Sequence, residues 1–339
     1  MNCLCKGSWK SWWKMMRMQI MNDMKRLERL VMVSIWCIQE DSALRPTMRK
    51  GLESLSISIS DGDPPFLCDF RISACPNLVH IELSALNLKL CCIDRCSQLR
   101  LLALTHSSLG ELSLQDCPLV LFQKEGLPSN LHELEIRNCN QLTPQVDWGL
   151  QRLASLTRLS IECGCEDVDL FPNKYLLPSS LTSLVISKLP NLKSLNSKGL
   201  QQLTFLLKLE ISSYPEPHCF AGSVFQHPIS LKVLRICDCP RLQSLRELGF
   251  QQLTSLVELG IIKCCELQSL TEVGLQHLTS LEKLNIQWCS KLQYLTKQRL
   301  SDSLSYLHVY DCPSLEQRCQ FEKGLEWCYI AHIPKIVIN

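Results

Sequence analysis

The amino-acid sequence predicts an α/β solenoid, in which repeated units stack side by side around a parallel β-sheet. Three observations predict this fold. Leucine accounts for 63 of the 339 residues, whereas glycine accounts for only 13. A leucine-based pattern recurs along most of the chain at nearly constant spacing. Apolar positions alternate within that pattern, as they do along one face of a β-strand. Units of this kind bury a continuous core only when neighbouring units stack.

The repeated pattern is L-x-x-[LFC]-x-[LIV]-x-x-[CLY]. Its spacings are 21, 21 and 22 residues, then 25 residues six times, and finally 23 residues. A chance pattern would not keep a 25-residue frame through six steps. The spacing therefore predicts a leucine-rich-repeat solenoid (a horseshoe) with a parallel concave β-sheet and short helices or loops on the convex side. A weaker twelfth match begins at Leu52, and the eleven clear matches begin at Leu67, Leu88, Leu109, Leu131, Leu156, Leu181, Leu206, Leu231, Leu256, Leu281 and Leu304.

Each unit is expected to contribute one strand and one sharp turn. In the unit that begins at Leu131, the side chains of Leu134 and Ile136 share one face of an extended chain. The chain turns away from the strand at the ninth position. That position is cysteine in eight units, and we expect these thiols to be buried as small apolar groups: Cys75, Cys96, Cys117, Cys139, Cys239, Cys264, Cys289 and Cys312.

The convex side is expected to differ between the short and the long units. The long units contain Gly-[Leu/Phe]-Gln-x-Leu-x-x-Leu, as at 149–156 and 274–281. Its spacing of three to four residues predicts a short helical turn. The 21-residue units instead contain a second alternating run, as at 79–83, which predicts an extended convex side.

Composition and cysteine placement restrict the class of protein. The formal net charge is +2, which argues against nucleic acid as a partner. No apolar run approaches the roughly 20 residues of a membrane span, so we expect no membrane association. The 21 cysteines show no C-x-x-C spacing, and those of the repeat occur once per unit. That placement suits a reducing compartment, and we expect a cytoplasmic protein.

The sequence contains no motif that predicts catalysis. It lacks the Gly-rich loop, His-Arg-Asp and Asp-Phe-Gly of a kinase, and it has no P-loop. His132 and Glu133 are not followed by a second histidine at the spacing of a zinc protease, and on a strand they should point to opposite faces. The C-x-C pairs Cys163/Cys165 and Cys237/Cys239 should each place one thiol inward. We therefore predict no enzyme activity, no cofactor and no metal site.

The concave surface is the candidate binding site. Residues of opposite charge occupy equivalent positions of neighbouring units at Glu133/Arg158, Glu210/Arg235 and Glu258/Lys283. One interpretation is solvated cross-strand pairs, each contributing a few tenths of a kcal/mol. The other is protein recognition, for which the candidates are Glu133, Glu135, Arg158, Lys208, Glu210, Arg235, Glu258, Lys283, Trp288, Tyr306, His308 and Tyr310.

Aromatic residues should gather at the C-terminal end of this surface. Trp288, Tyr306, His308 and Tyr310 are expected on the concave face of the last two units. Exposed aromatic side chains are enriched in protein contacts. They could equally cover the end of the core together with the terminal segment, and both interpretations remain open at this point.

The repeat region resembles the leucine-rich repeats of plant intracellular nucleotide-binding immune receptors of the coiled-coil class. The similarity lies in the Cys-Pro-x-Leu turns, the phrase Leu-Pro-Ser-Ser-Leu at 177–181, the Gly-Leu-Gln-Gln-Leu-Thr segments and the closing segment 324–336. It covers about residues 51–339, with a C-terminal cap near 316–339. The resemblance implies protein recognition in plant defence, directed at a pathogen effector or a guarded host protein, or an autoinhibitory contact with a nucleotide-binding domain.

Residues 26–50 resemble the last part of a plant receptor-like kinase domain. The similarity lies in 26–41 followed by Arg45-Pro46-Thr47-Met48. In that family the arginine matching Arg45 pairs with an acidic residue further upstream, which has no counterpart here. The resemblance implies an alternative function, as a fragment or fusion related to a kinase signalling protein without kinase activity of its own.

The sequence thus divides into residues 1–25, expected to be disordered, a helical kinase-tail-like segment at 26–50, and a repeat domain of 11 to 12 units at 51–339. A ubiquitin-ligase adaptor is a third possibility for repeats of this kind. No F-box-like segment is evident near the N-terminus, which argues against it.

Overall fold

The computed structural model describes residues 53–59, 69–85, 88–105, 108–122, 126–142, 149–162, 170–173, 175–189, 191–192, 194–213, 224–225, 230–271 and 273–339. The expectations for 1–50, for the leucines at 52 and 67 and for the Cys163/Cys165 pair fall outside these residues.

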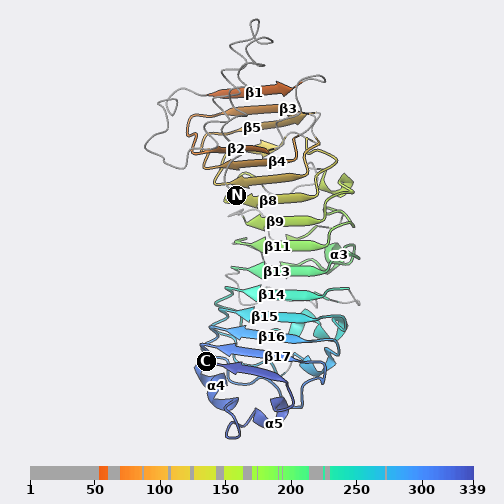
Figure 1. Cartoon of the computed structure of the whole chain (residues 1–339), viewed down its shortest axis with the longest axis vertical. Coiled ribbons are helices and arrows are strands. Elements are labelled where there is room, and N and C mark those ends of the chain that lie inside the picture. The colour runs from red at the N-terminus through yellow and green to blue at the C-terminus, as the bar shows by residue number, and fades with distance from the viewer. Residues whose placement is uncertain are drawn as a thin grey trace, which may run out of the picture.

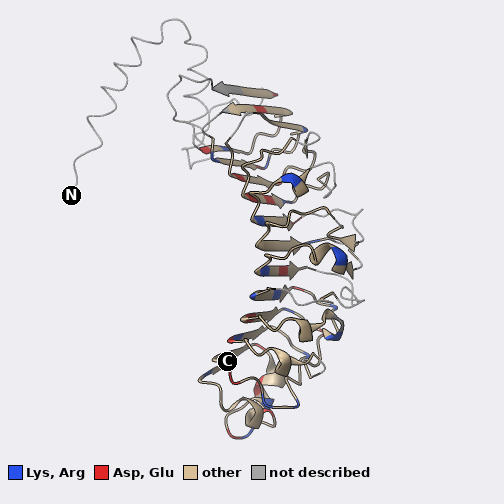
Figure 2. Cartoon of the chain, turned by 90° about the vertical axis from the view of Figure 1, so that its right-hand side faces the viewer, with Lys and Arg blue, Asp and Glu red and all other residues tan. Residues whose placement is uncertain are grey.

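The chain forms a parallel β-solenoid, as predicted (Figure 1). Twelve parallel strands pair in one sheet, and Figure 2 shows that this sheet lines the concave side of the curved molecule. Eleven of these strands each begin two residues after a pattern leucine. In spatial order the twelve strands are β2 (Asp69–Ser73), β4 (Leu90–Asp94), β6 (Glu111–Gln115), β8 (Glu133–Arg137), β9 (Arg158–Glu162), β11 (Ser183–Ser187), β13 (Lys208–Ser212), β14 (Val233–Cys237), β15 (Glu258–Ile262), β16 (Lys283–Gln287), β17 (Tyr306–Tyr310) and β18 (Lys335–Ile338).

A second, four-stranded sheet forms the opposite wall of the short units. Its order is β1 (Ser54–Ile59), β3 (His80–Ala85), β5 (Leu101–Thr105) and β7 (Leu121–Phe122). The extended convex side predicted for the short units is therefore confirmed. The weaker match at Leu52 does not supply a concave strand, because β1 pairs with β3, with Leu55 in register with Ile81. Alternation of apolar residues predicts a strand but does not determine which wall it joins.

The long units carry short helices on the convex side, as predicted (Figure 1). Three single-turn 3-10 helices follow glycines whose φ is 70° to 79°. Residues that have a Cβ atom rarely adopt this backbone conformation. The C-terminal cap contains two further helices, α4 and α5. The convex elements and the cap helices are η3 (Leu150–Arg152), β10 (Leu170–Phe171), β12 (Ser194–Leu195), α3 (Ser197–Leu200), η4 (Arg246–Leu248), η5 (Phe250–Gln252), η6 (Leu275–His277), α4 (Pro313–Arg318) and α5 (Trp327–Ile330).

One continuous apolar core runs through the stack from Leu55 to Ile333. Strand residues alternate between buried and outward positions, as in β8, where Leu134 and Ile136 are fully buried. The alternation leaves a row of outward side chains on every strand. Because strands pair in register, equivalent outward positions form columns along the solenoid.

The described turns after the concave strands use a residue in the left-handed conformation, which was not predicted from the sequence. Where the structure describes it, the residue before the ninth position has φ between 50° and 58°, and its N–H donates to the carbonyl of the next strand in several units, as Ala74 does to Asp94 at 2.9 Å. The cost of left-handed backbone is about 1–2 kcal/mol per residue, and the extra hydrogen bond offsets part of it. Asp and Asn tolerate this conformation best, and they occupy it at Asp116, Asn138, Asp238 and Asp311.

Two glycines with the same φ of 79° provide a matched test of the convex turns. A Cβ on Gly274 would meet the movable His277 ring at 3.0 Å, so Gly274→Ala should lower the free energy of unfolding by about 1 kcal/mol. A Cβ on Gly249 would lie 2.4 Å from the Phe225 carbonyl oxygen. Gly249→Ala should therefore be clearly more destabilising in urea unfolding, and equal losses would contradict the packing of Gly249 against Phe225.

Candidate functional site

The outward face of the concave sheet carries all twelve candidate residues. Glu133 and Glu135 lie on β8, Lys208 and Glu210 on β13, and the three residues Tyr306, His308 and Tyr310 on β17. Arg158, Arg235, Glu258 and Lys283 lie on β9, β14, β15 and β16, and Trp288 follows β16. The columns expected from the alternation are therefore formed.

One of the three predicted cross-strand charge pairs forms as expected, between Arg158 and Glu133. The other two do not form. Arg235 Nη2 instead pairs with Glu258 Oε1 at 2.7 Å, and Lys208 Nζ pairs with Glu210 Oε2 of its own strand at 3.2 Å. Arg235 is in register with Gly260, and its side chain lies against that glycine. Because Gly260 has no side chain, the Arg235 guanidinium can extend past it to Glu258, which lies on the same strand, β15.

Residues of both charges are distributed along the concave sheet (Figure 2). Besides the pairs above, Arg137 contacts Glu135 at 2.5 Å and Lys188 contacts Glu162 at 2.7 Å. The hydrogen bond with Glu258 raises the pKa of Arg235 above its ordinary value. This part of the surface is therefore polar but locally neutralised.

Glu111, His132 and Glu133 bring three possible metal-ligand atoms within 4.8 Å of one another. The prediction that His132 and Glu133 point to opposite faces is therefore wrong. His132 precedes β8, and its ring lies close to Gly110, where a Cβ would approach Nε2 to 2.7 Å. The Glu133 hydrogen bond raises the pKa of Arg158, and the charge of Glu111 adds to the effect. Glu133 of this cluster is thus paired with the Arg158 guanidinium.

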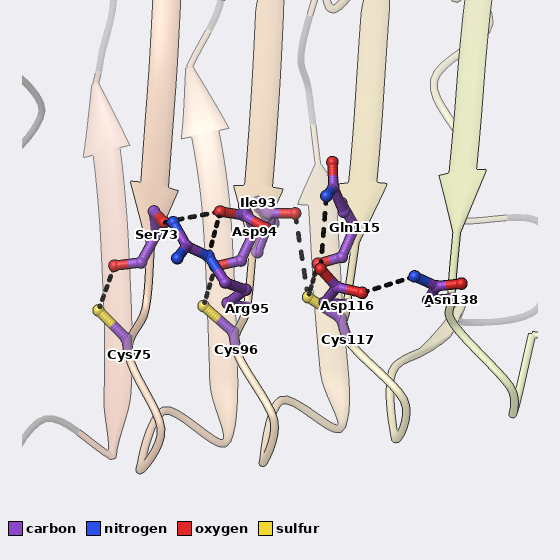
Figure 3. A network of polar contacts seen from close by, with 10 residues as sticks. All are labelled: Ser73, Cys75, Ile93, Asp94, Arg95, Cys96, Gln115, Asp116, Cys117 and Asn138. Atoms are coloured by element: carbon purple, nitrogen blue, oxygen red, sulfur yellow. Dashed lines mark hydrogen bonds and ion pairs between the residues drawn. The ribbon is translucent and has the colours of Figure 1, made fainter.

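The eight repeat cysteines are buried free thiols, as predicted. Figure 3 shows Cys75, Cys96 and Cys117 in a row at the ends of neighbouring strands. Their thiols donate to carbonyl oxygens two residues earlier, and the bond from Cys117 to Gln115 is 3.2 Å long. The small thiol thus fills the core and also pairs a carbonyl where the chain turns.

A row of polar side chains accompanies these thiols on the outside of the turn (Figure 3). Ser73 Oγ donates to Asp94 Oδ2 at 2.8 Å, and Arg95 Nε donates to the same oxygen at 2.8 Å. Asn138 Nδ2 donates to Asp116 Oδ1 at 2.8 Å. The contacts of Ser73 with Asp94 and of Asn138 with Asp116 join neighbouring units at the strand ends.

Burial keeps several of the thiols protonated at neutral pH. Burial raises the pKa of Cys237 to about 11 and that of Cys319 to about 12. Hydrogen bonds with neighbouring thiols, together with burial, raise the pKa of Cys117 and Cys264. Because the thiolate is the reactive form, protonated groups of this kind are inert. The C-x-C pair is arranged as expected, with Cys239 buried and Cys237 half-buried on the outward face.

The aromatic residues at the C-terminal end form one connected group, as predicted. We call Trp288, Tyr306, His308 and Tyr310 the C-terminal aromatic surface. The ring centroids of Trp288 and Tyr310 are 5.5 Å apart, those of Tyr306 and His308 6.1 Å, and those of His308 and Tyr310 6.2 Å. Trp288 is 38% exposed and Tyr310 is 40% exposed.

Other residues cover the end of the core. Strand β18 pairs with β17, and the side chains of Ile330 and Ile333 in the terminal segment are buried against the last unit. Ile336 and Ile338 pack partly against the same core. The aromatic rings therefore stand on the outward face next to this cap. Two lysines that the sequence analysis missed, Lys263 and Lys335, lie over Trp288 and Tyr306.

No family model matches the chain. A stretch of 52 residues is 48% identical to a putative disease resistance protein of Arabidopsis thaliana and covers 15% of this chain and 4% of that protein. Another match, 43% identical over 54 residues, is to the G-type lectin S-receptor-like serine/threonine-protein kinase LECRK1 of Oryza sativa subsp. indica, covering 16% of this chain and 6% of the kinase. The matched stretches thus span less than a tenth of either relative.

Among solved structures, the chain is similar to the functional domain of InlJ from Listeria monocytogenes, which includes a cysteine ladder. That match has a TM-score of 0.29 and 14% identity and covers 74% of this chain and 71% of InlJ. The match to TLR13 in its complex with ssRNA13 has a TM-score of 0.37 and 18% identity, covering 75% of this chain and 44% of TLR13. Among the described residues, no helix has the length and apolar character that a membrane crossing requires.

Adjacent residues of β15 provide a test of how the outward and inward faces differ. Glu258→Gln removes one partner of a solvent-exposed ion pair and should change the free energy of unfolding by less than about 1 kcal/mol. Leu259→Ala leaves a cavity in the core and should cost about 2–5 kcal/mol. Urea unfolding of the two variants measures both values, and similar losses would contradict the assignment of the two faces.

Thiol burial predicts a specific pattern of alkylation. With N-ethylmaleimide at pH 8, the exposed Cys328 should react in the folded chain, whereas Cys117, Cys264 and Cys289 should react only after unfolding. Peptide mass spectrometry with and without urea reads each position separately. Fast labelling of Cys264 in the native chain would show that the turn is open.

Proposed function

We propose that this chain is a non-catalytic protein-recognition solenoid that acts in plant defence. The observation that carries the proposal is the C-terminal aromatic surface, a connected group of rings that stands on the outward face while other residues close the core. Large aromatic side chains at the surface are the usual anchors of protein interfaces, because they bury much area with few rotatable bonds.

The size of the concave face supports a protein as the ligand. Twelve strands at about 4.8 Å spacing and five residues of about 3.3 Å each give a face of about 50 Å by 16 Å. Its area of about 800 Å² equals the share of one partner in a standard protein interface. The neutralised charges between β8 and β15 suit the polar part of such an interface, and they form no site for a nucleic acid or a membrane.

The role in defence is supported by the short match to a plant disease resistance protein and by the turn and cap motifs of the sequence. The partner would be a pathogen effector, a guarded host protein, or a nucleotide-binding domain held in an autoinhibited state. With any of these partners, the chain would act in the cytoplasm. The absence of kinase and P-loop motifs from the sequence supports a role without catalysis or cofactors.

A second candidate is a fragment or fusion related to a receptor-like kinase signalling protein. It is supported by the matches to plant receptor-like kinases, which span 43 to 54 residues. These stretches are too short to form a kinase domain, so the chain would have no kinase activity of its own. Its partners would then include components of kinase signalling.

Differential affinity capture from plant leaf extract tests the proposal. We expect specific proteins to bind the wild-type chain. The captured amount of each should be at least tenfold lower for the Trp288→Ala/Tyr310→Ala variant, because this variant lacks the exposed aromatic anchors. Phe205→Ala is the matched control, since Phe205 is 64% exposed but lies outside the concave sheet. Quantitative mass spectrometry measures the bound proteins, and thermal unfolding checks that all variants are folded.

The captured proteins also separate the alternatives. Effectors, host targets or a nucleotide-binding domain would support the role in defence, whereas receptor-like kinases and their substrates would support the second candidate. An identical set of proteins on the wild type and the double variant would falsify recognition through this surface.

A further inference from the structure

Three lysine side chains surround the C-terminal aromatic surface. Lys263 Nζ lies 5.7 Å from the centroid of the Trp288 ring, and Lys335 Nζ lies 5.2 Å from that of Tyr306. Lys283 occupies the position on β16 in register with Tyr306. All three lysines are exposed, and none forms an ion pair with a residue that the structure describes.

The acidic groups of this region leave the three lysines uncompensated. Glu258 is in register with Lys283, but its carboxylate is held by Arg235 at 2.7 Å. Asp311, at the turn after β17, forms no ion pair with a described residue. In contrast, the cations of β9, β13 and β14 are all paired with glutamates. The unpaired positive charge of the concave face therefore concentrates where the aromatic rings are exposed.

The register fixes the arrangement of these groups. Lys283, Tyr306 and Lys335 are direct neighbours on β16, β17 and β18. At about 4.8 Å per strand, the two lysines flank the tyrosine from opposite sides. An anionic group above Tyr306 would be reached by an ammonium group from either side.

Hydrogen bonds fix the polar side chains that lie between the lysines and the exposed rings. Gln287 Nε2 donates to Asn285 Oδ1 at 2.8 Å and lies 3.3 Å from His308 Nδ1. His308 in turn contacts the rings of Tyr306 and Tyr310. A preorganised surface of this kind loses little conformational entropy when a ligand binds.

The three lysine ammonium groups act as point charges that attract carboxylates and phosphates alike. Binding of single-stranded nucleic acid needs a continuous basic groove, whereas the whole chain has a net charge of only +2. Charge complementarity therefore points to Asp and Glu side chains of a protein.

We propose that the C-terminal aromatic surface binds an extended acidic segment of the partner protein. Carboxylates of that segment contact Lys263, Lys283 and Lys335, and an apolar side chain beside them packs against Trp288 and Tyr310. The inference rests on the proposed function, because it specifies the chemistry of the partner at the same surface.

Selection from a phage-displayed library of random 12-residue peptides against the whole chain tests this proposal. The enriched peptides should carry an excess of Asp and Glu, and fluorescence anisotropy measures their affinity as synthetic peptides. Lys283→Glu/Lys335→Glu should weaken binding at least tenfold, since it replaces attraction by repulsion. Lys188→Glu/Lys291→Glu is the matched control, because those lysines are paired with Glu162 and Glu266 and do not lie over the rings of Trp288 or Tyr306. The control should stay within twofold of the wild type.

The outcomes separate this proposal from the proposed function. The enriched peptides could lack an excess of Asp and Glu and still bind the Trp288→Ala variant more weakly than the wild type. That result would overturn the proposal of an acidic segment, but it would support protein recognition by this surface. Failure to enrich any peptide would also overturn the acidic segment, while the capture experiment decides on recognition itself. Binding of poly(U) that is lost in Lys283→Glu/Lys335→Glu would assign the surface to nucleic acid and overturn both. Thermal unfolding of each variant excludes loss of fold as the cause.

Discussion

The whole structure depends on burial of each unit's apolar face by the next unit. A single strand with its turn cannot cover the leucine and isoleucine side chains on its inner face, as Leu134 and Ile136 of β8 show. Stacking covers them from both sides, and the buried apolar area increases with every unit added. This requirement keeps neighbouring strands in register from β2 to β17. The side chains of the outward face do not contribute to the core, so they can contact a binding partner.

The sharp turn after each strand links the core to the surface. The ninth-position thiol points inward, where it fills the core and donates to a carbonyl oxygen. The residue before it adopts a left-handed conformation at the edge of the concave face. Lys263 and Trp288 both occupy this position, and the turn brings Lys263 over the Trp288 ring and Trp288 against Tyr310. The constraint that ends each strand therefore also builds part of the candidate binding surface.

Charge divides the concave face into two regions. From β8 to β15 the guanidinium and ammonium groups are engaged by glutamates, and such exposed pairs contribute little to stability. At β16 to β18 the lysines face aromatic rings instead of carboxylates. A partner that approaches the first region must displace existing ion pairs, whereas at the second it meets unpaired charge and exposed rings. The physical case for recognition is therefore strongest at the C-terminal end.

The features that depend on local periodicity could be predicted from the sequence alone. The two-residue alternation and the 25-residue frame predicted the parallel concave sheet, the buried thiols and the clustering of Trp288 with the rings of β17. Three features become visible only in the folded chain: the wall that β1 joins, the pairing of Arg235 with Glu258, and the position of Lys335 of β18 beside Tyr306. Periodicity fixes which face a residue lies on, because that follows from the backbone of one unit. The choice of partner depends on side-chain length and on space left by neighbouring units, such as the gap at Gly260, and these arise only once the units are stacked.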